Sequence, residues 1–126
     1  MEKKIMAMKN VFDEHESKVL QETIASASRY CASVESMEHH MKMLYHRCLD
    51  AEEYQSEVKK LDTRRRSAHD SFISRTKALN RICENRGLQQ FYEGDIDDRM
   101  KVSDFAFYLR ESINEGEPTQ RVRCVK

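Results

Sequence analysis

The first 86 residues of the sequence contain neither glycine nor proline. Several strands joined by turns are hard to fit into such a stretch, because turns depend heavily on these two residues. Alanine, leucine, methionine, glutamate, lysine and arginine are plentiful there, and all of them favour helices. We therefore predict an all-α fold, a helical bundle built on long helices.

Apolar residues recur at alternating steps of three and four in two successive segments. The first row is Leu20, Ile24, Ala27, Cys31, Val34, Glu38, Met41, Tyr45 and Cys48, with Glu38 as its one polar interruption. The second row is Ala51, Tyr54, Val58, Leu61, Arg65, Ala68, Phe72, Arg75, Leu79 and Ile82. This seven-residue spacing places each row on one face of a helix. A parallel row of Tyr30, Met37 and Leu44 widens the first apolar face.

The ends of these two helices carry capping signals. Asp13 with Glu16, and Asp50 with Glu53, have the spacing of a capping box, and Gly87 is a typical helix stop. So short a connection near residue 50 forces the two helices to run antiparallel. Residues whose numbers sum to about 99 should then face each other across the hairpin.

Shorter helices are predicted on both sides of this hairpin. Residues 2–12 form an amphipathic helix, and residues 103–115 form another with a predicted buried set of Phe105, Ala106, Tyr108, Leu109 and Ile113. We predict a single helical-bundle domain over residues 1–115 and a flexible polar tail over 116–126. The short helices can cover only part of the apolar face, so we expect a second copy of the chain to cover the rest in a homodimer.

Charge and hydropathy narrow the possible partners. Twenty-two basic and twenty-two acidic residues cancel, which excludes a strong overall field for nucleic acid or membrane. No segment approaches the ~20 apolar residues that span a bilayer, and the first residues lack the apolar run of a signal peptide. We expect a cytoplasmic protein with no membrane partner, whose four cysteines are free thiols.

The densest polar cluster lies at residues 62–70. Asp62, Arg65 and His69 are three and four apart, so they share one helical face. Arg65 occupies an inward heptad position, where a buried arginine needs an acidic partner. The antiparallel register offers Glu35 and Glu38 on the facing helix. One interpretation is therefore a polar core network of these five residues that fixes the register of the hairpin.

A second interpretation is catalytic. Arg64 and His69 are spaced Arg-x4-His, which resembles the motif of HEPN domains, helical bundles that often act as metal-independent ribonucleases. The resemblance implies proton transfer by His69 at a ribose 2′-hydroxyl and stabilisation of phosphate charge by Arg64. In that family two copies of the motif meet across a dimer. The family usually carries Asn, Asp or His directly after the arginine, where this chain has Arg65.

A basic row suggests a nucleic-acid surface. The candidates for contacting a phosphate backbone are Lys59, Lys60, Arg64 and Arg66. The alternative is a solvated face balanced by acidic residues early in the preceding helix, Asp13, Glu14, Glu16 and Glu22. No aromatic residues interleave with the basic ones as stacking platforms, which favours the alternative.

Two further stretches, residues 61–81 and 98–106, are similar to a family of small uncharacterised bacterial proteins. The resemblance implies a bacterial or phage-related protein and brings no known activity. We predict no cofactor and no metal, because His39 and His46 share a face only at seven-residue spacing. Our leading hypothesis is a non-enzymatic module that self-associates or binds a protein partner; the rival is a HEPN-type protein that binds or cleaves RNA.

Overall fold

A computed structural model describes residues 1–47 and 49–114. This part of the chain contains four helices and no strand: α1 (Glu2–Val11), α2 (Glu14–His46), α3 (Ala51–Asn85) and α4 (Arg99–Asn114). The all-α prediction is therefore confirmed. None of these helices is long and apolar enough to cross a membrane. Cys48 and the predicted tail at 116–126 lie outside the described residues.

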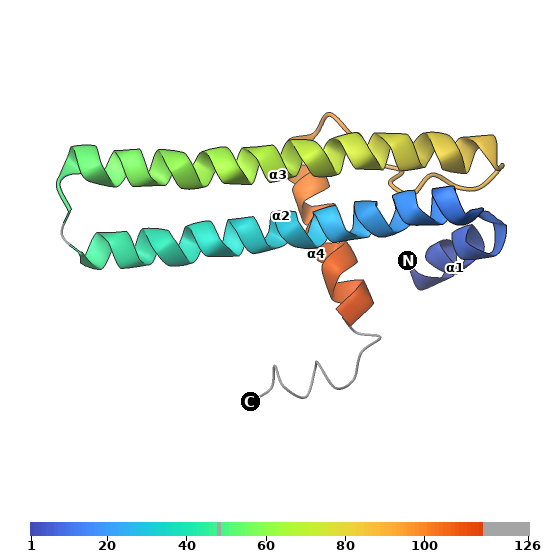
Figure 1. Cartoon of the computed structure of the whole chain (residues 1–126), viewed down its shortest axis with the longest axis horizontal. Coiled ribbons are helices and arrows are strands. Elements are labelled where there is room, and N and C mark those ends of the chain that lie inside the picture. The colour runs from blue at the N-terminus through green and yellow to red at the C-terminus, as the bar shows by residue number, and fades with distance from the viewer. Residues whose placement is uncertain (48, 115–126) are drawn as a thin grey trace.

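The helices α2 and α3 run antiparallel and side by side along the whole length of the molecule (Figure 1). The helix α1 lies at the open end of this hairpin, beside the start of α2. The segment 86–98 returns along α3 from the open end toward the middle, and α4 starts there and crosses the hairpin. Only the half of the hairpin nearer the open end is therefore covered by other helices.

The boundaries of the long helices follow from their caps. The Asp13 carboxylate accepts a 2.8 Å hydrogen bond from the Glu16 amide, and the Glu16 carboxylate accepts one of 3.0 Å from the Asp13 amide. This reciprocal pair is the predicted capping box. At the start of α3 the Asp50 carboxylate accepts a 2.8 Å bond from the Glu53 amide. The predicted turn between α2 and α3 is thereby confirmed.

The C-terminus of α3 has the hydrogen-bond pattern of a Schellman motif. Gly87 has a φ of +71°, and its amide donates to the Glu84 carbonyl at 3.1 Å. The Leu88 amide donates to the Cys83 carbonyl at 2.8 Å. These bonds satisfy carbonyls that lack a partner at a helix end, and the left-handed conformation makes glycine the favoured residue.

We expect Gly87→Ala to lower the free energy of unfolding by about 1 kcal/mol, because an alanine side chain disfavours positive φ. A Cβ at this position meets nothing within 4 Å, so steric overlap adds no cost. Gly87→Asn is the matched control, since asparagine tolerates this conformation better and should lose less. Urea denaturation measures both variants, and equal losses would contradict backbone conformation as the cause.

The register of the hairpin agrees with the prediction. The Tyr30 ring stacks on the His69 ring with centroids 4.7 Å apart. The Thr23 hydroxyl contacts the Arg75 carbonyl oxygen at 3.4 Å. The residue numbers in each pair sum to within one of the expected 99. Sequence periodicity and a short turn were therefore enough to align the two long helices.

The core lies where α1, α4 and the segment 86–98 pack on the hairpin. Its fully buried members include Met8, Leu20, Ala27, Cys31, Phe72, Leu79, Cys83, Phe91, Val102, Ala106 and Leu109. The two cysteines are free thiols, and burial raises the pKa of Cys31 to about 11. Burial also raises the pKa of Cys83. Both sulfurs are therefore protonated core groups, with little nucleophilic character.

Two predicted inward residues are exposed. Tyr108 is 52% exposed, because the buried face of α4 is the one that carries Val102, Ala106 and Leu109, and Tyr108 lies at its edge. Tyr45 is 75% exposed, whereas the neighbouring Leu44 is buried. Leu44 lies on the same side of α2 as Tyr30, whose ring stacks on His69 of α3. Tyr45 continues the row of Ala27 and Cys31, which is buried only where the core with α1 and α4 covers it.

Candidate functional site

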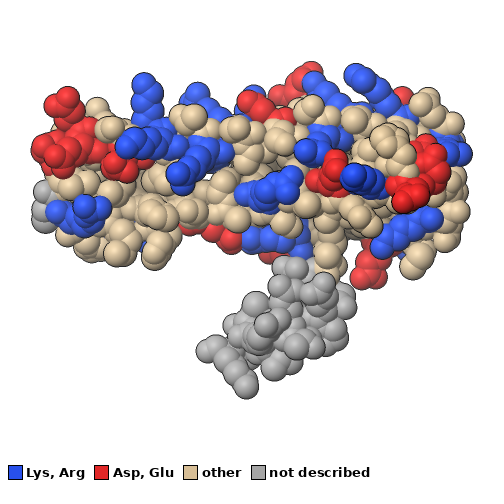
Figure 2. Space-filling view, in the orientation of Figure 1, with Lys and Arg blue, Asp and Glu red and all other residues tan. Residues whose placement is uncertain are grey.

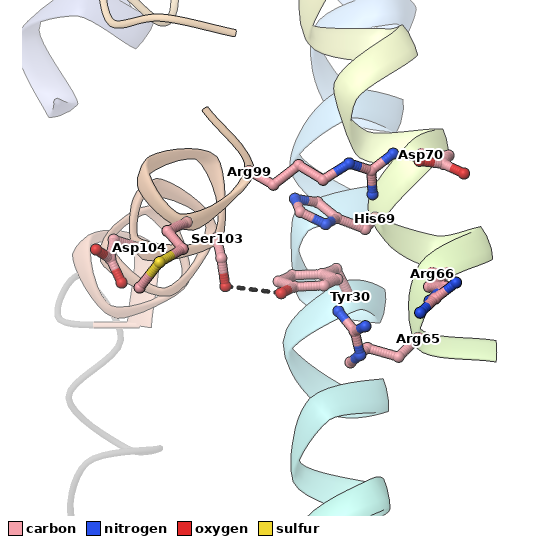
Figure 3. A pocket seen from close by; sticks show the side chains of 9 residues that line it. Tyr30, Arg65, Arg66, His69, Asp70, Arg99, Ser103 and Asp104 are labelled. Carbon is pink, nitrogen blue, oxygen red and sulfur yellow. Dashed lines mark hydrogen bonds and ion pairs between the residues drawn. The ribbon is translucent and has the colours of Figure 1, made fainter. Parts of the chain in front are cut away.

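A hollow of about 600 Å³ opens between the middle of the hairpin and the start of α4 (Figure 3). Its lining consists of Tyr30, Arg65, Arg66, His69, Asp70, Arg99, Met100, Ser103 and Asp104. The α3 residues of this set come from the polar cluster at 62–70. The α4 residues were not predicted, because nothing in the sequence showed where α4 crosses the hairpin.

His69 is the most buried polar side chain of the hollow, with 1% of its surface exposed. Neither ring nitrogen has a hydrogen-bond partner within the described chain. Burial lowers the pKa of His69, and the positive charges of Arg99 and Arg65 lower it further. At neutral pH the ring is therefore uncharged, with one N–H donor and one acceptor. A buried polar group without a hydrogen bond lowers the stability of the folded state by about 1–3 kcal/mol, so the position of His69 is unfavourable for folding alone.

The Tyr30 and Ser103 hydroxyls lie 2.7 Å apart and join α2 to α4 (Figure 3). Tyr30 also forms one face of the His69 environment, with the two rings inclined at 29°. In a bond between two hydroxyls one group donates and the other keeps a free O–H. The hollow therefore offers a hydroxyl donor next to the His69 ring.

Arg65, Arg66 and Arg99 line the hollow around the Tyr30 and His69 rings. Two of these arginines pair with the same carboxylate. Arg65 donates to Asp62 through Nε and Nη2 at 3.1 and 2.8 Å, and Arg66 Nε contacts the other oxygen of Asp62 at 2.9 Å. The hydrogen bond from Arg65 is the main cause that lowers the pKa of Asp62. Arg99 Nη2 contacts Asp70 at 2.6 Å, in a pair that is more than half exposed. The Arg99–Asp70 pair is therefore weak and exchangeable.

The structure does not bring Arg64 and His69 together within one chain. Arg64 is exposed and lines a different hollow, with Ser26, Arg29 and Ser67, whereas His69 lines the one beside α4. Residues five apart on a helix point in clearly different directions. Arg65, which is four residues before His69, is the α3 arginine of this cluster that lies beside it.

Part of the predicted polar network forms and part does not. Arg65 pairs with Asp62, as their spacing suggested. Glu35 binds Arg110 of α4 at 2.7 and 2.8 Å, and Glu38 is exposed. The predicted pairing of Arg65 with Glu35 or Glu38 was wrong, because reasoning from two helices could not include the arginine that α4 supplies.

Several basic residues of α3, and Arg86 directly after it, pair with acidic neighbours. Arg75 pairs with Glu22 at 2.9 Å, and Arg86 Nε donates to Glu16 at 3.0 Å. Lys60 contacts Glu57 at 3.3 Å, while Lys59 is exposed. Figure 2 shows Lys and Arg side chains spread along α3 with Asp and Glu among them. The acidic start of α2 therefore balances Arg75 and Arg86, as predicted for the basic row, whereas Lys60 and Arg66 pair with acidic residues of α3 itself.

Among residues 1–47 and 49–114 no group of three or more His, Cys, Asp or Glu side chains could hold a metal ion.

Sequence reasoning missed two site residues that it could have found. The register rule pairs residue 30 with residue 69, which identifies Tyr30, and Asp70 directly follows His69. Arg99 and Ser103 carried no comparable signal.

The fold and the hollow define a helical-hairpin domain with a polar site where a crossing helix meets the hairpin. Residues 2–116 match the model of a family described as a protein of unknown function (DUF3232), and the chain belongs to that family. This agrees with the resemblance to an uncharacterised helical family seen in the sequence. Neither the curated proteins nor the solved structures include a match to the chain.

Proposed function

We propose that this protein is a non-enzymatic helical module that self-associates through the outer half of its hairpin. This surface, the hairpin tip, consists of residues 36–46 of α2 and 51–64 of α3. The observation that carries the proposal is that no described helix packs on the tip. In this proposal the tip of a second copy of the chain covers the hairpin tip.

The crossing helix α4 stops short of the tip. Its Arg110 reaches Glu35, the α2 residue that precedes the tip. No side chain of the tip belongs to the hydrophobic core of the described chain. In Figure 1 the tip projects as two helices alone, away from α1 and α4. Two helices without a third layer leave the flanks of a wide apolar face in water.

The tip carries more apolar side chains than a two-helix seam can bury. Met37, Met41, Tyr54, Val58 and Leu61 are only half-buried there. Met43 is 52% exposed and Tyr45 is 75% exposed. Figure 2 shows mostly uncharged side chains over the α2 part of the tip. Met43 and Tyr45 lie on opposite flanks of α2, so apolar side chains are exposed on both sides of the tip. Apolar surface that a protein leaves exposed can mark an interaction site.

The charge pattern of the tip favours a second copy as the partner. Acidic residues, Glu52, Glu53 and Glu57, lie at the start of α3, and basic residues, Lys59, Lys60 and Arg64, follow one to two turns later. When two tips overlap about a two-fold axis, the acidic part of one chain lies beside the basic part of the other. The result is a four-helix bundle, the usual way to cover a helical hairpin.

The test is the solution mass of the double variant Met43→Glu with Tyr45→Glu. Both side chains are exposed in the monomer, so the variant should fold, but it places a charge on each flank of α2 at the tip, so that the interface meets a charge on whichever flank it uses. We expect a wild-type dimer by size exclusion with light scattering, and a dissociation constant raised at least about tenfold in the variant. Far-UV circular dichroism confirms that the helices are intact.

The matched control is Met6→Glu with Val11→Glu, which places the same charges on the exposed side of α1. This control should remain a dimer. A wild-type protein that is monomeric at all concentrations would overturn the proposal. A dimer that the tip variant and the control disturb equally would place the interface elsewhere.

RNA cleavage by Arg64 and His69 has less support, because the two side chains line different hollows. A dimer that joined one chain's Arg64 to the other's His69 would revive it. An RNA degradation assay with wild type and His69→Ala separates the two functions. Cleavage that disappears in the variant would overturn the non-enzymatic proposal.

A further inference from the structure

We propose that the hollow between α3 and the start of α4 binds a phosphomonoester, with Arg66 and Arg99 holding the phosphate oxygens and His69 donating a hydrogen bond to them. This site is separate from the hairpin tip and does not depend on self-association. Its ligand is a small phosphorylated molecule of the size of a mononucleotide.

The size and walls of the hollow fit such a ligand. A volume of about 600 Å³ is within the range of small-molecule sites. The walls are predominantly polar or charged, with Tyr30 and Met100 as the larger apolar surfaces. An apolar ligand would leave these polar groups without partners, whereas a phosphate accepts hydrogen bonds from all of the donors present.

The guanidinium groups of the hollow can still form ion pairs and hydrogen bonds with a bound anion. Arg65 and Arg66 share the single carboxylate of Asp62, which leaves one of the two charges uncompensated. Arg99 holds Asp70 through one contact in an exposed pair. A phosphate offers more acceptor oxygens than Asp70 and binds arginine in a fork geometry. Arg99 can therefore exchange Asp70 for a phosphate at little cost.

His69 is the second, independent observation that points to a ligand. The side chain is 99% buried, and both ring nitrogens lack partners within the described chain. Figure 3 shows its ring between the Arg99 side chain and Tyr30, at the centre of the hollow. When Arg99 turns from Asp70 to a bound phosphate, it uncovers the ring. The His69 N–H and the free hydroxyl of the Tyr30–Ser103 pair then both have an acceptor.

Two carboxylates in the hollow repel a phosphate and compete with it for the arginines, which limits the affinity for the ligand. Asp70 and Asp104 also line the hollow. Figure 3 shows the Asp104 carboxylate turned away from the three guanidinium groups, so Asp70 is the main competitor. Binding should therefore weaken with ionic strength and fall in the micromolar to millimolar range, as expected for partly solvated arginines.

The experiment titrates the full chain with inorganic phosphate and with AMP at constant ionic strength, by calorimetry and by NMR of the His69 ring. We expect saturable binding of at least one of the two and a shift of the His69 resonances. Arg66→Gln and Arg99→Gln should each weaken binding by about tenfold. Both side chains are mostly exposed, so these variants should fold.

Arg64→Gln is the matched control. It removes the same charge two residues before Arg66 on α3, but its side chain lines a different hollow. Binding that is unchanged in this variant supports the site. Equal weakening by all three variants would mean a general charge effect and would overturn the proposal. Unshifted His69 resonances with both probes, or binding only of a single-stranded RNA that depends on Arg64, would overturn it as well.

Discussion

Replacing Phe72 by alanine is expected to lower the free energy of unfolding by about 3–5 kcal/mol, the usual cost of truncating a fully buried phenylalanine. Phe72 has no exposed surface, and it lies on the part of α3 that contacts α4. Its ring faces Phe105 of α4 with centroids 6.2 Å apart. The resulting cavity cannot close without moving α4. Urea denaturation, followed by far-UV circular dichroism, measures the loss.

Tyr108→Ala is the control for this prediction. It removes an aromatic side chain of α4 that is 52% exposed, and it should cost less than about 1 kcal/mol. The comparison also tests the packing side of α4, because sequence spacing alone predicted Tyr108 to be buried. A loss for Tyr108→Ala that matched the loss for Phe72→Ala would contradict the exposed position of Tyr108 on α4.

The sequence predicts the hairpin well because its determinants are local. The cap at Asp13, the turn before Ala51 and the stop at Gly87 each depend on a few neighbouring residues. The seven-residue rows then fix which faces meet, and the short turn fixes the register. Errors enter where burial depends on a third helix. Tyr45 is the example, since it continues the row of Ala27 and Cys31 beyond the core that buries those two residues.

The candidate site could be predicted only in part, because half of it depends on a long-range contact. Asp62, Arg65 and His69 share a helical face and form one wall. The other wall comes from the start of α4, which reaches the hairpin through the irregular segment 86–98. The periodicity of α4 does not specify where it crosses or that Arg110 takes Glu35 as its partner. Such contacts follow from packing of the whole core.

Acidification below about pH 6.5 is expected to destabilise the protein through His69. Burial and the charges of Arg99 and Arg65 lower its pKa below the ordinary 6.5, and only the nearby Asp70 acts against them. In this range the unfolded chain binds more protons than the folded one, so stability rises with pH. The loss therefore begins as pH falls through 6.5 and continues down to the pKa of the folded state. The lowered pKa values of Glu16 and Glu35 act only below about 4.5.

Thermal melts of wild type and His69→Phe between pH 7.5 and 5 measure this contribution. Phenylalanine keeps a flat ring against Tyr30 but cannot bind a proton, so the drop in melting temperature over this range should largely disappear. His39→Phe, which changes an exposed histidine of α2, should leave the drop in place. If His69→Phe kept the full pH dependence, the folded state would not lower the pKa of His69 relative to the unfolded chain, which would contradict the prediction.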